Sequence, residues 1–289
     1  MKSAAVSVVM PVYNGERFLA ESIQSVLDQS FSDLELIIVN DDSEDASDRI
    51  VRQFRDKRIK YFENERNLGL VGNWNRCFEL ATSDYVTMLH QDDVMLPENV
   101  ERKVQILSST PYRWVASNCL QIDEHGKRIH EEWFRHPIAL SVAQKSQREK
   151  FDRMFFESNY ICFCTVMWER SLLREAGEFK DDAGYCTDVQ MWLRTLTLAD
   201  LCYIPVPLIK YRWAQNVSLR NDNDDWFFEN YLARKAIVEE LKLGFRYRAF
   251  LRYVLGFGCL HRALVSYCRG NRGKARKMIS GLGHVSPIL

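Results

Sequence analysis

Along the first hundred residues, short apolar runs alternate with segments in which apolar side chains recur every three or four positions. The runs occupy residues 4–12, 34–39 and 59–62, and a fourth begins at Tyr85, which predicts four strands. The spaced segments predict helices, the first with Asn14 as a candidate N-cap. Strands that alternate with helices in this way predict βαβ units around a mostly parallel sheet.

Polar side chains follow three of the predicted strands: Tyr13-Asn14, Asn40-Asp41-Asp42 and the carboxylate pair Asp92-Asp93. Open α/β sheets bind their ligands beyond the carboxyl ends of the strands. Three polar strand ends from consecutive strands therefore predict one shared site of nucleotide size. For the carboxylate pair alone, a second interpretation stays open, namely a solvated turn that caps the helix expected near Pro97.

Carboxylates dominate this predicted site. The chain contains neither G-x-G-x-x-G nor G-x-x-x-x-G-K-[ST], so the sequence indicates neither the usual dinucleotide-binding turn nor a P-loop. Adjacent acids at a strand end are suited to holding a hard divalent cation against phosphate oxygens. The sequence therefore favours metal-bridged phosphate over phosphate held by backbone amides.

Charge is distributed unevenly along the 289 residues, although the chain carries 39 basic and 39 acidic side chains. Residues 231–289 contain 12 Lys and Arg against 2 Asp and Glu, which leaves 27 basic and 37 acidic residues in the first 230. Residues 226–289 also contain many aromatic side chains. We expect this extension to be helical and to lie on a membrane surface, to pack on the rest of the protein, or to form a dimer. No recognised motif supports nucleic-acid binding.

The eight cysteines show no C-x-x-C pair and no spacing typical of a disulfide framework, so we expect buried free thiols. The N-terminus lacks the features of a cleavable signal, and no apolar run reaches the roughly 18 residues that a membrane span needs. A reducing, cytoplasmic environment is the expectation that fits these observations.

Taken together, six motifs in order resemble those of the inverting family 2 glycosyltransferases with the GT-A fold. The matching segments are Pro11-Val12-Tyr13-Asn14-Gly15, residues 39–45 (similar to V-D-D-G-S-x-D), Asn67-Leu68-Gly69, residues 89–93 (similar to L-D-x-D-D), residues 167–179 (similar to R-x-x-x-x-x-x-G-x-F), and residues 187–194 (similar to E-D-x-x-x-W-L-R) followed by Tyr211-Arg212. The resemblance covers about residues 5–220. It implies an α/β GT-A domain at residues 1–222, with a nucleotide-sugar-binding half at 1–110 and an acceptor-side half at 111–222, and a helical extension at 223–289.

The resemblance also implies roles for individual residues. Asp93 would ligate Mn²⁺ or Mg²⁺, and Asp92 would face the ribose or the water shell of the cation. The other residues implied to bind the nucleotide-sugar donor are Pro11, Val12, Tyr13, Asn14, Asp41, Arg66, Asn67, Gly69 and Arg212. The acceptor would be a glycan or a lipid-linked oligosaccharide of the cell envelope.

Asp188 matches the family's general base, which takes the proton of the attacking hydroxyl in a single inverting displacement. Helix capping is the alternative role for this residue. Several positions depart from the family pattern: Asn40, Asp42, His90 and Thr187 replace Asp, Gly, Asp and Glu, and a His expected shortly after Arg212 is missing. These departures keep a second function open, a non-catalytic nucleotide-sugar-binding subunit. A phosphoacceptor signalling domain would also have acidic strand ends, but it would leave residues 167–212 without a role.

Overall fold

The computed structural model describes residues 4–129, 141–157, 159–182, 184–213 and 223–254. Predictions that fall on residues 214–222 and 255–289, among them most of the basic extension, lie outside the described residues. The chain divides into two compact units. The first contains Met1–Lys180 and Met191–Val217, and the second contains Asp181–Gln190 and Ser218–Leu289. The predicted domains, 1–222 and 223–289, stay a prediction.

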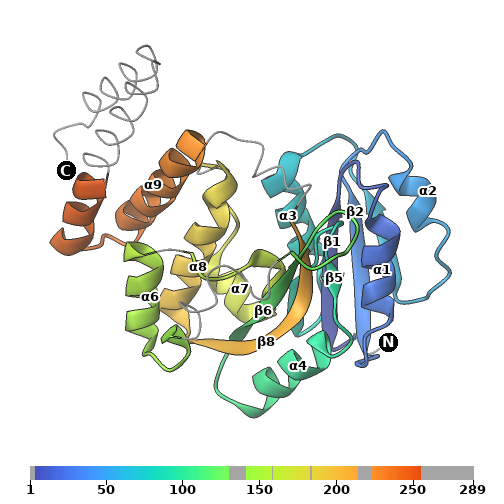
Figure 1. Cartoon of the computed structure of the whole chain (residues 1–289), viewed down its shortest axis with the longest axis horizontal. Helices are drawn as coiled ribbons and strands as arrows, with labels where there is room; N and C mark the ends of the chain where they lie inside the picture. The colour runs from blue at the N-terminus through green and yellow to red at the C-terminus, as the bar shows by residue number, and fades with distance from the viewer. Residues whose placement is uncertain (1–3, 130–140, 158, 183, 214–222, 255–289) are drawn as a thin grey trace. The chain divides into compact units, whose positions relative to one another are not determined.

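An eight-stranded sheet forms the centre of the first unit (Figure 1). Its strands run in the order β3-β2-β1-β4-β7-β6-β8-β5. Their bounds are β1 Val6–Val12, β2 Leu34–Asn40, β3 Ile59–Glu63, β4 Tyr85–Met88, β5 Val94–Met95, β6 Trp114–Ile122, β7 Val166–Glu169 and β8 Leu201–Arg212. The prediction of an α/β protein with a largely parallel N-terminal sheet is confirmed.

The four N-terminal strands pair in parallel, with β1 between β2 and β4. Strands β1 and β2 are buried along nearly their whole length, which explains their continuous apolar sequences. Because these strands point the same way, their carboxyl ends lie at one edge of the sheet. This arrangement confirms that the polar strand ends predicted from the sequence are neighbours.

The other half of the sheet is mixed. Strand β7 is antiparallel to both β4 and β6, while β6 and β8 run parallel with register shifts between Ser117 and Cys119. The short strand β5 pairs antiparallel with β8, and Val94 lies opposite Lys210. This pairing brings the end of β8 beside the turn that contains Asp92 and Asp93.

Helices connect and flank these strands (Figure 1). Their bounds are α1 Leu19–Leu27, α2 Ser47–Val51, α3 Gly69–Leu80, α4 Asn99–Ser109, α6 Gln147–Phe156, α7 Arg170–Ala176, α8 Thr187–Leu198 and α9 Asn223–Glu240. Helix α3 contacts β1 and β2, and α4 contacts β6. Within the described part of the chain, no helix is both long enough and apolar enough to cross a membrane.

The expectation that Asn14 caps the first helix is wrong. Helix α1 begins at Leu19 with Phe18 at the N-cap position. Asn14 instead adopts a positive φ of 48° in the preceding loop, and its side-chain oxygen accepts a hydrogen bond from the backbone N–H of Glu44 at 3.0 Å. Asn tolerates this left-handed conformation better than most residues do, so the residue type serves the loop rather than the helix.

The second unit contains α9 and a further helical segment at residues 245–254. Asn230 on α9 donates a hydrogen bond to the Cys186 sulfur at 2.9 Å. Gly184 also lies close to α9, because a Cβ atom there would come within 2.4 Å of the Glu229 carboxylate. These contacts hold the segment at residues 184–190 against α9 within this unit.

Candidate functional site

The carboxyl ends of β1, β2 and β4 are joined by direct hydrogen bonds. The backbone N–H of Asp41 donates to the carbonyl of Val12 at 2.7 Å, which links the ends of β1 and β2. Tyr13 and Gln91 exchange two bonds of 2.9 Å each, from the Tyr13 N–H to the Gln91 side-chain oxygen and from the Gln91 amide to the Tyr13 carbonyl. Gln91 therefore ties the loop after β1 to the turn that carries the carboxylate pair.

Gly15 explains part of the P-V-Y-N-G motif. A Cβ atom at this position would lie 2.3 Å from the side-chain oxygen of Gln91, so only glycine allows the close approach. The Gln91 carbonyl also accepts a hydrogen bond of 2.8 Å from Ser22 on α1. Neither Gln91 nor Ser22 was identified from the sequence, and Gln91 carried no signal beyond its position inside the acidic motif.

Asp41 and Asn67 lie together, as the sequence predicted for two residues of one site. The Asp41 carboxylate is buried and accepts hydrogen bonds from the Asn64 side chain at 2.7 Å and from the Leu68 N–H at 2.8 Å. The Asn67 amide donates to the Asp41 carbonyl at 3.2 Å. Gly69 has a φ of 75°, and a Cβ there would meet no atom within 4 Å, so the backbone is open to a ligand.

The remaining predicted donor-binding residues of this region differ in exposure. Tyr13 is 49% exposed, and the side chains of Asn14 and Arg66 are also exposed. Val12 is buried in the core, so its side chain supports the loop from below. Pro11 is half-buried at the end of β1. The exposed ring of Tyr13 is the large apolar surface that this loop offers to a ligand.

Asp93 is almost completely buried, with 1% of its surface exposed. Its Oδ1 atom accepts a hydrogen bond from the backbone N–H of Arg212 at 2.9 Å, whereas Oδ2 has no hydrogen-bond partner among the described residues. Burial and the neighbouring charge of Asp92 raise the pKa of the Asp93 carboxyl well above its usual range, although the backbone N–H of Arg212 and the nearby thiol of Cys164 act in the opposite direction. A buried carboxylate oxygen without a donor is a place where a cation or a proton lowers the energy.

Asp92 precedes Asp93 and is only half-buried. Burial raises the pKa of the Asp92 carboxyl, and the positive charge of Arg212 acts in the opposite direction. Its backbone carbonyl accepts a hydrogen bond of 2.8 Å from the Nε atom of Arg212. Of the two acids, Asp92 has the carboxylate with the greater access to solvent.

His90 stands where the family pattern has an acid. Its ring stacks on Trp74 and Phe163, with ring centroids 5.6 and 5.3 Å away. Burial lowers the pKa of this imidazole to about 4, so the side chain is neutral at physiological pH. Its Nδ1 atom lies 3.7 Å from Oδ2 of Asp93, and its Nε2 atom has no hydrogen-bond partner in the described ranges.

Asn40 also departs from the family pattern, and its contacts give a reason. Its side-chain amide donates to the Tyr61 hydroxyl at 3.0 Å. That hydroxyl lies at hydrogen-bond distance from Asp48 and Glu63, at 3.0 and 3.1 Å. An aspartate at position 40 would add a third carboxylate to this cluster and remove a donor. The substitution therefore fits a local network and does not by itself indicate a degenerate site.

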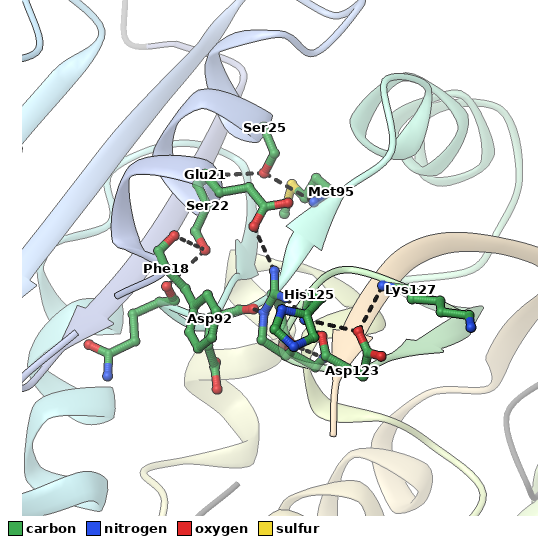
Figure 2. A network of polar contacts seen from close by, with 12 residues as sticks. Phe18, Glu21, Ser22, Ser25, Asp92, Met95, Asp123, His125 and Lys127 are labelled. Carbon is green, nitrogen blue, oxygen red and sulfur yellow. Dashed lines mark hydrogen bonds and ion pairs between the residues drawn. The ribbon is translucent and has the colours of Figure 1, made fainter. Parts of the chain in front are cut away.

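Arg212 lies behind the carboxylate pair and is 1% exposed. Besides its bond to the Asp92 carbonyl, it donates from Nη1 to the Asp123 carbonyl at 2.9 Å and from Nη2 to the Glu21 carboxylate at 2.6 Å (Figure 2). Its guanidinium also lies over the Phe18 ring, 4.2 Å from the centroid. Glu21 and Asp123 were not identified from the sequence, because nothing in their local patterns separates them from ordinary surface residues, and Phe18 was interpreted only as part of the apolar face of the first helix.

The residues present fit a divalent cation only in part. No group of three or more His, Cys, Asp or Glu side chains in the described ranges is arranged to hold a metal ion. The pair Asp92 and Asp93 nevertheless offers one half-exposed carboxylate and one unpartnered carboxylate oxygen. Mg²⁺ and related ions are commonly held by one or two carboxylates together with substrate phosphates, so this donor set is sufficient when phosphate completes it.

Asp188, the predicted general base, belongs to the second unit. It lies in the first turn of α8 and is half-buried. One of its carboxylate oxygens accepts a hydrogen bond from the N–H of the next residue, Val189, at 2.7 Å. In the same unit, Gln190 donates to Asp182 at 2.6 Å. The assignment of Asp188 as the general base stays a prediction.

Comparison with known proteins bears on this arrangement. The profile described as Glycosyl transferase family 2 matches residues 7–177, more than half of the chain. The chain belongs to glycosyl transferase family 2. The matched range contains the carboxylate pair and all three polar strand ends, and it confirms the family resemblance drawn from the motifs.

Among relatives of this family member, an uncharacterized glycosyltransferase of Rickettsia typhi is 29% identical over 212 residues, which cover 73% of this chain and 64% of the relative. The protein named EpsE of Bacillus subtilis, also described as a glycosyltransferase, is 40% identical over 195 residues, covering 65% and 66%. The chain thus spans somewhat less than two thirds of the length of these relatives.

Solved structures show the same fold. TarS 1–349 of S. aureus in complex with UDP-GlcNAc matches with a TM-score of 0.63 and 14% identity, over 94% of this chain and 90% of that chain. The mannosyltransferase PcManGT of Pyrobaculum calidifontis in complex with GDP-Man and Mn²⁺ matches with a TM-score of 0.57 and 14% identity, over 98% and 76%. The GT-A fold predicted from the sequence is confirmed.

Proposed function

We propose that this family 2 protein transfers a sugar from a nucleoside-diphosphate donor to a hydroxyl group of a glycan or a lipid-linked acceptor. The observation that carries the proposal is the carboxylate pair Asp92-Asp93, at the edge of the sheet that also contains the ends of β1 and β2. Its unpartnered oxygen and its raised pKa values are consistent with a site that a bound cation completes. Solved structures with this fold bind UDP-GlcNAc and GDP-Man, which supports a nucleotide-sugar donor.

The donor would lie along the ends of β1 and β2. Tyr13 provides an exposed ring for the base, and Pro11, Val12 and Asn14 shape the loop beneath it. Asp41, Asn67 and Gly69 form the opposite side, with Arg66 exposed beside them. Of these, Asp41 already accepts two hydrogen bonds within the protein, so we expect its contact with ribose or base to use its second carboxylate oxygen.

A divalent cation, Mn²⁺ or Mg²⁺, bound when the donor is present would neutralise charge on the departing diphosphate. We propose that Asp92 and Asp93 hold it, in keeping with the Mn²⁺ in the PcManGT structure. Asp92 is the more accessible carboxylate, and Oδ2 of Asp93 is the one without a donor. The two residues are therefore expected to act as a pair.

Asp188 is proposed as the general base that accepts the proton of the attacking hydroxyl. A single displacement with this base on the acceptor side inverts the configuration at the anomeric carbon. The support is the match of residues 187–194 to the family motif and the half-buried position of Asp188 in the first turn of α8.

The proposed acceptor belongs to the cell envelope. We propose that the protein works in the cytoplasm at the inner face of a membrane, with its C-terminal extension in peripheral contact. The support is chemical: from residue 241 to residue 289 the chain contains ten Lys and Arg and neither Asp nor Glu. Such a segment is attracted to anionic lipid headgroups.

The test is release of nucleoside diphosphate from UDP-, GDP- and dTDP-sugars with Mn²⁺, measured with and without acceptor. A transferase hydrolyses its donor slowly in the absence of acceptor, whereas a non-catalytic binding subunit does not. Asp188→Asn is expected to bind donor normally and to lose transfer by about 10²-fold or more. Asp93→Ala is expected to lose metal-dependent nucleotide binding.

The exposed neighbour Asp181 supplies the control. Asp181→Asn should retain both binding and transfer. Full transfer by Asp188→Asn would remove this residue from the role of base. No turnover of any donor by the wild-type protein, together with normal nucleotide binding, would favour the non-catalytic alternative.

A further inference from the structure

Arg212 connects three separate parts of the candidate site in the first unit, and Figure 2 labels a residue from each: Asp92, Asp123 and Glu21. It is the last residue of β8, and its guanidinium donates from Nε to the Asp92 carbonyl at 2.8 Å, from Nη1 to the Asp123 carbonyl at 2.9 Å and from Nη2 to the Glu21 carboxylate at 2.6 Å. Three nitrogens of one side chain thus reach the carboxylate turn, the turn after β6 and helix α1.

Arg212 also holds the second acid of the pair. Its backbone N–H donates to Oδ1 of Asp93 at 2.9 Å, while its side chain holds the carbonyl of Asp92. One residue therefore fixes the main chain of the first acid and the side chain of the second. With Oδ1 occupied in this way, Oδ2 is the oxygen of Asp93 that remains for another ligand.

The two groups that hold the Arg212 guanidinium near the start of α1, Glu21 and Phe18, suit its positive charge. Glu21 supplies the opposite charge, and its side chain is half exposed. The Phe18 ring lies 4.2 Å from the guanidinium carbon, which adds a cation–π contact. Because Arg212 is 1% exposed and its donors point to protein acceptors, its charge is satisfied within the protein.

We propose that Arg212 is a positioning residue that fixes the Asp92–Asp93 turn in the geometry that binds the cation, and that its side chain does not contact the nucleotide. This replaces the donor-binding role that the family resemblance implied for it. The inference rests on the proposed function, since it takes the carboxylate pair to be the cation site. Groups that orient ligand residues from behind usually change metal affinity by about 10- to 100-fold when they are removed.

Three variants separate this role from others. Arg212→Gln removes the charge and at least one of the three side-chain bonds, and Arg212→Lys keeps the charge although a single nitrogen cannot reach all three acceptors. Glu21→Gln alters only the half-exposed anchor and is the variant to use if a change at the buried Arg212 prevents folding. Arg17→Gln is the control, because Arg17, just before α1, lies over the same Phe18 ring and reaches the turn after β6 through Glu124 at 2.6 Å, without touching the acids.

The first readout is hydrogen exchange of residues 89–95 without any ligand. Arg212→Gln and Arg212→Lys should accelerate exchange in this segment while β1 and β2 exchange as in the wild type, Glu21→Gln should show a smaller change of the same kind, and Arg17→Gln should show none. The second readout is binding of UDP and GDP against Mn²⁺ concentration. The variants at position 212 should raise the half-saturating Mn²⁺ concentration about 10-fold and leave the weak affinity measured in EDTA unchanged.

Two results would overturn the inference. Unchanged exchange at residues 89–95 in both variants at position 212 would show that Arg212 does not hold the turn. An equal loss of nucleotide affinity in EDTA and in Mn²⁺ would show that Arg212 touches the nucleotide directly. If the wild-type protein binds none of UDP, GDP and dTDP, the proposed function fails, and the exchange measurement still decides whether Arg212 positions the turn.

Discussion

At the scale of single residues, the buried guanidinium of Arg212 joins groups from three distant parts of the chain. Glu21, Asp92 and Asp123 meet there only through the pairing of β5, β6 and β8. The acids Asp41, Asp92 and Asp93 were identifiable from the sequence because each follows an apolar strand, whereas these contacts of Arg212 were not. Sequence patterns indicate chemical type at a position, whereas a buried contact depends on which elements the fold brings together.

Lys103 is a second residue whose environment only the structure reveals. It lies on α4, is 0% exposed, and its Nζ atom has no hydrogen-bond partner among the described residues. Burial lowers the pKa of this ammonium group from 10.5 to about 7, although the nearby thiols of Cys164 and Cys162 act in the opposite direction. Below pH 7 the folded protein must therefore carry an unpaired buried charge.

Replacing Lys103 should stabilise the protein. Between pH 7 and pH 10.5, the Lys103 side chain is protonated in the unfolded chain and neutral in the folded protein. The free energy of unfolding therefore rises with pH across this window, and below pH 7 the full cost of the buried charge applies. At about 1.4 kcal/mol for each pKa unit, Lys103→Met should raise the free energy of unfolding by about 2–4 kcal/mol at pH 6, and by much less near pH 10. Urea denaturation across this pH range measures the gain.

Lys150 provides the matched control. It is equally buried, but it donates to the Asp200 carboxylate and to the Leu201 carbonyl, both at 2.8 Å. Lys150→Met should destabilise the protein, because it removes the ion-pair partner of Asp200 and the donor to the Leu201 carbonyl. A Lys103→Met variant that loses stability at pH 6 would contradict the account of Lys103.

At the scale of elements, strands β1 to β4 and helices α1 to α4 were predictable, because strands give short apolar runs and helices give spaced apolar positions. The same patterns did not predict the strands of the mixed half of the sheet. Strand β8 contains Pro205 and Pro207 within its bounds, which normally argue against a strand. Its register shifts against β6 near Asn118 accommodate the irregularity, and only the structure displays them.

Gly177, in the motif at residues 167–179, is a glycine because of the backbone conformation at the end of α7. It ends α7 with φ 80° and ψ −169°, a conformation that is essentially restricted to glycine. Gly177→Ala should therefore lower the free energy of unfolding by about 1–3 kcal/mol, measured by chemical denaturation. The added Cβ would also approach the Arg194 guanidinium at 3.4 Å.

Gly244 serves as the comparison, because a Cβ atom there would meet nothing within 4 Å and its backbone has no positive φ. Gly244→Ala should cost less than about 1 kcal/mol, because Gly244 is the N-cap of the helical segment at residues 245–254, where glycine is preferred over alanine, but its backbone is not strained. Equal effects of the two substitutions would mean that the backbone conformation of Gly177 is not the reason for glycine at this position.

At the scale of the whole molecule, the fold class followed from the order of elements, and the family followed from six motifs together. The sequence did not indicate that residues 181–190 group with the C-terminal residues in a second compact unit, because such grouping depends on contacts such as that of Asn230 with Cys186. The six cysteines in the described ranges form no disulfide, and five of them are buried, as the sequence predicted.

The C-terminal unit carries the prediction about membranes. Phe245 is 80% exposed, and Arg248 and Arg252, on the same face of the helical segment, are also exposed. We expect the protein to sediment with vesicles that contain anionic lipid and not with neutral ones. Each basic residue near an anionic surface contributes about 1 kcal/mol, so the double variant Arg248→Gln/Arg252→Gln should bind about 30-fold more weakly.

A double variant of exposed arginines in the other unit, Arg52→Gln/Arg102→Gln, is the control and should bind vesicles as the wild type does. Equal binding to neutral and anionic vesicles would contradict the electrostatic contact. Binding to single-stranded nucleic acid but not to vesicles would assign the basic extension to a different partner.

The central claim is that the carboxylate edge of the sheet binds a nucleoside diphosphate together with a divalent cation. The most direct measurement is the melting temperature with UDP, GDP or dTDP, each in Mn²⁺, Mg²⁺ or EDTA, since a ligand that binds only the folded protein raises it. We predict a rise of several degrees with one nucleotide in the presence of metal, and its loss in EDTA and in Asp93→Ala. No shift with any nucleotide in any metal would contradict the claim.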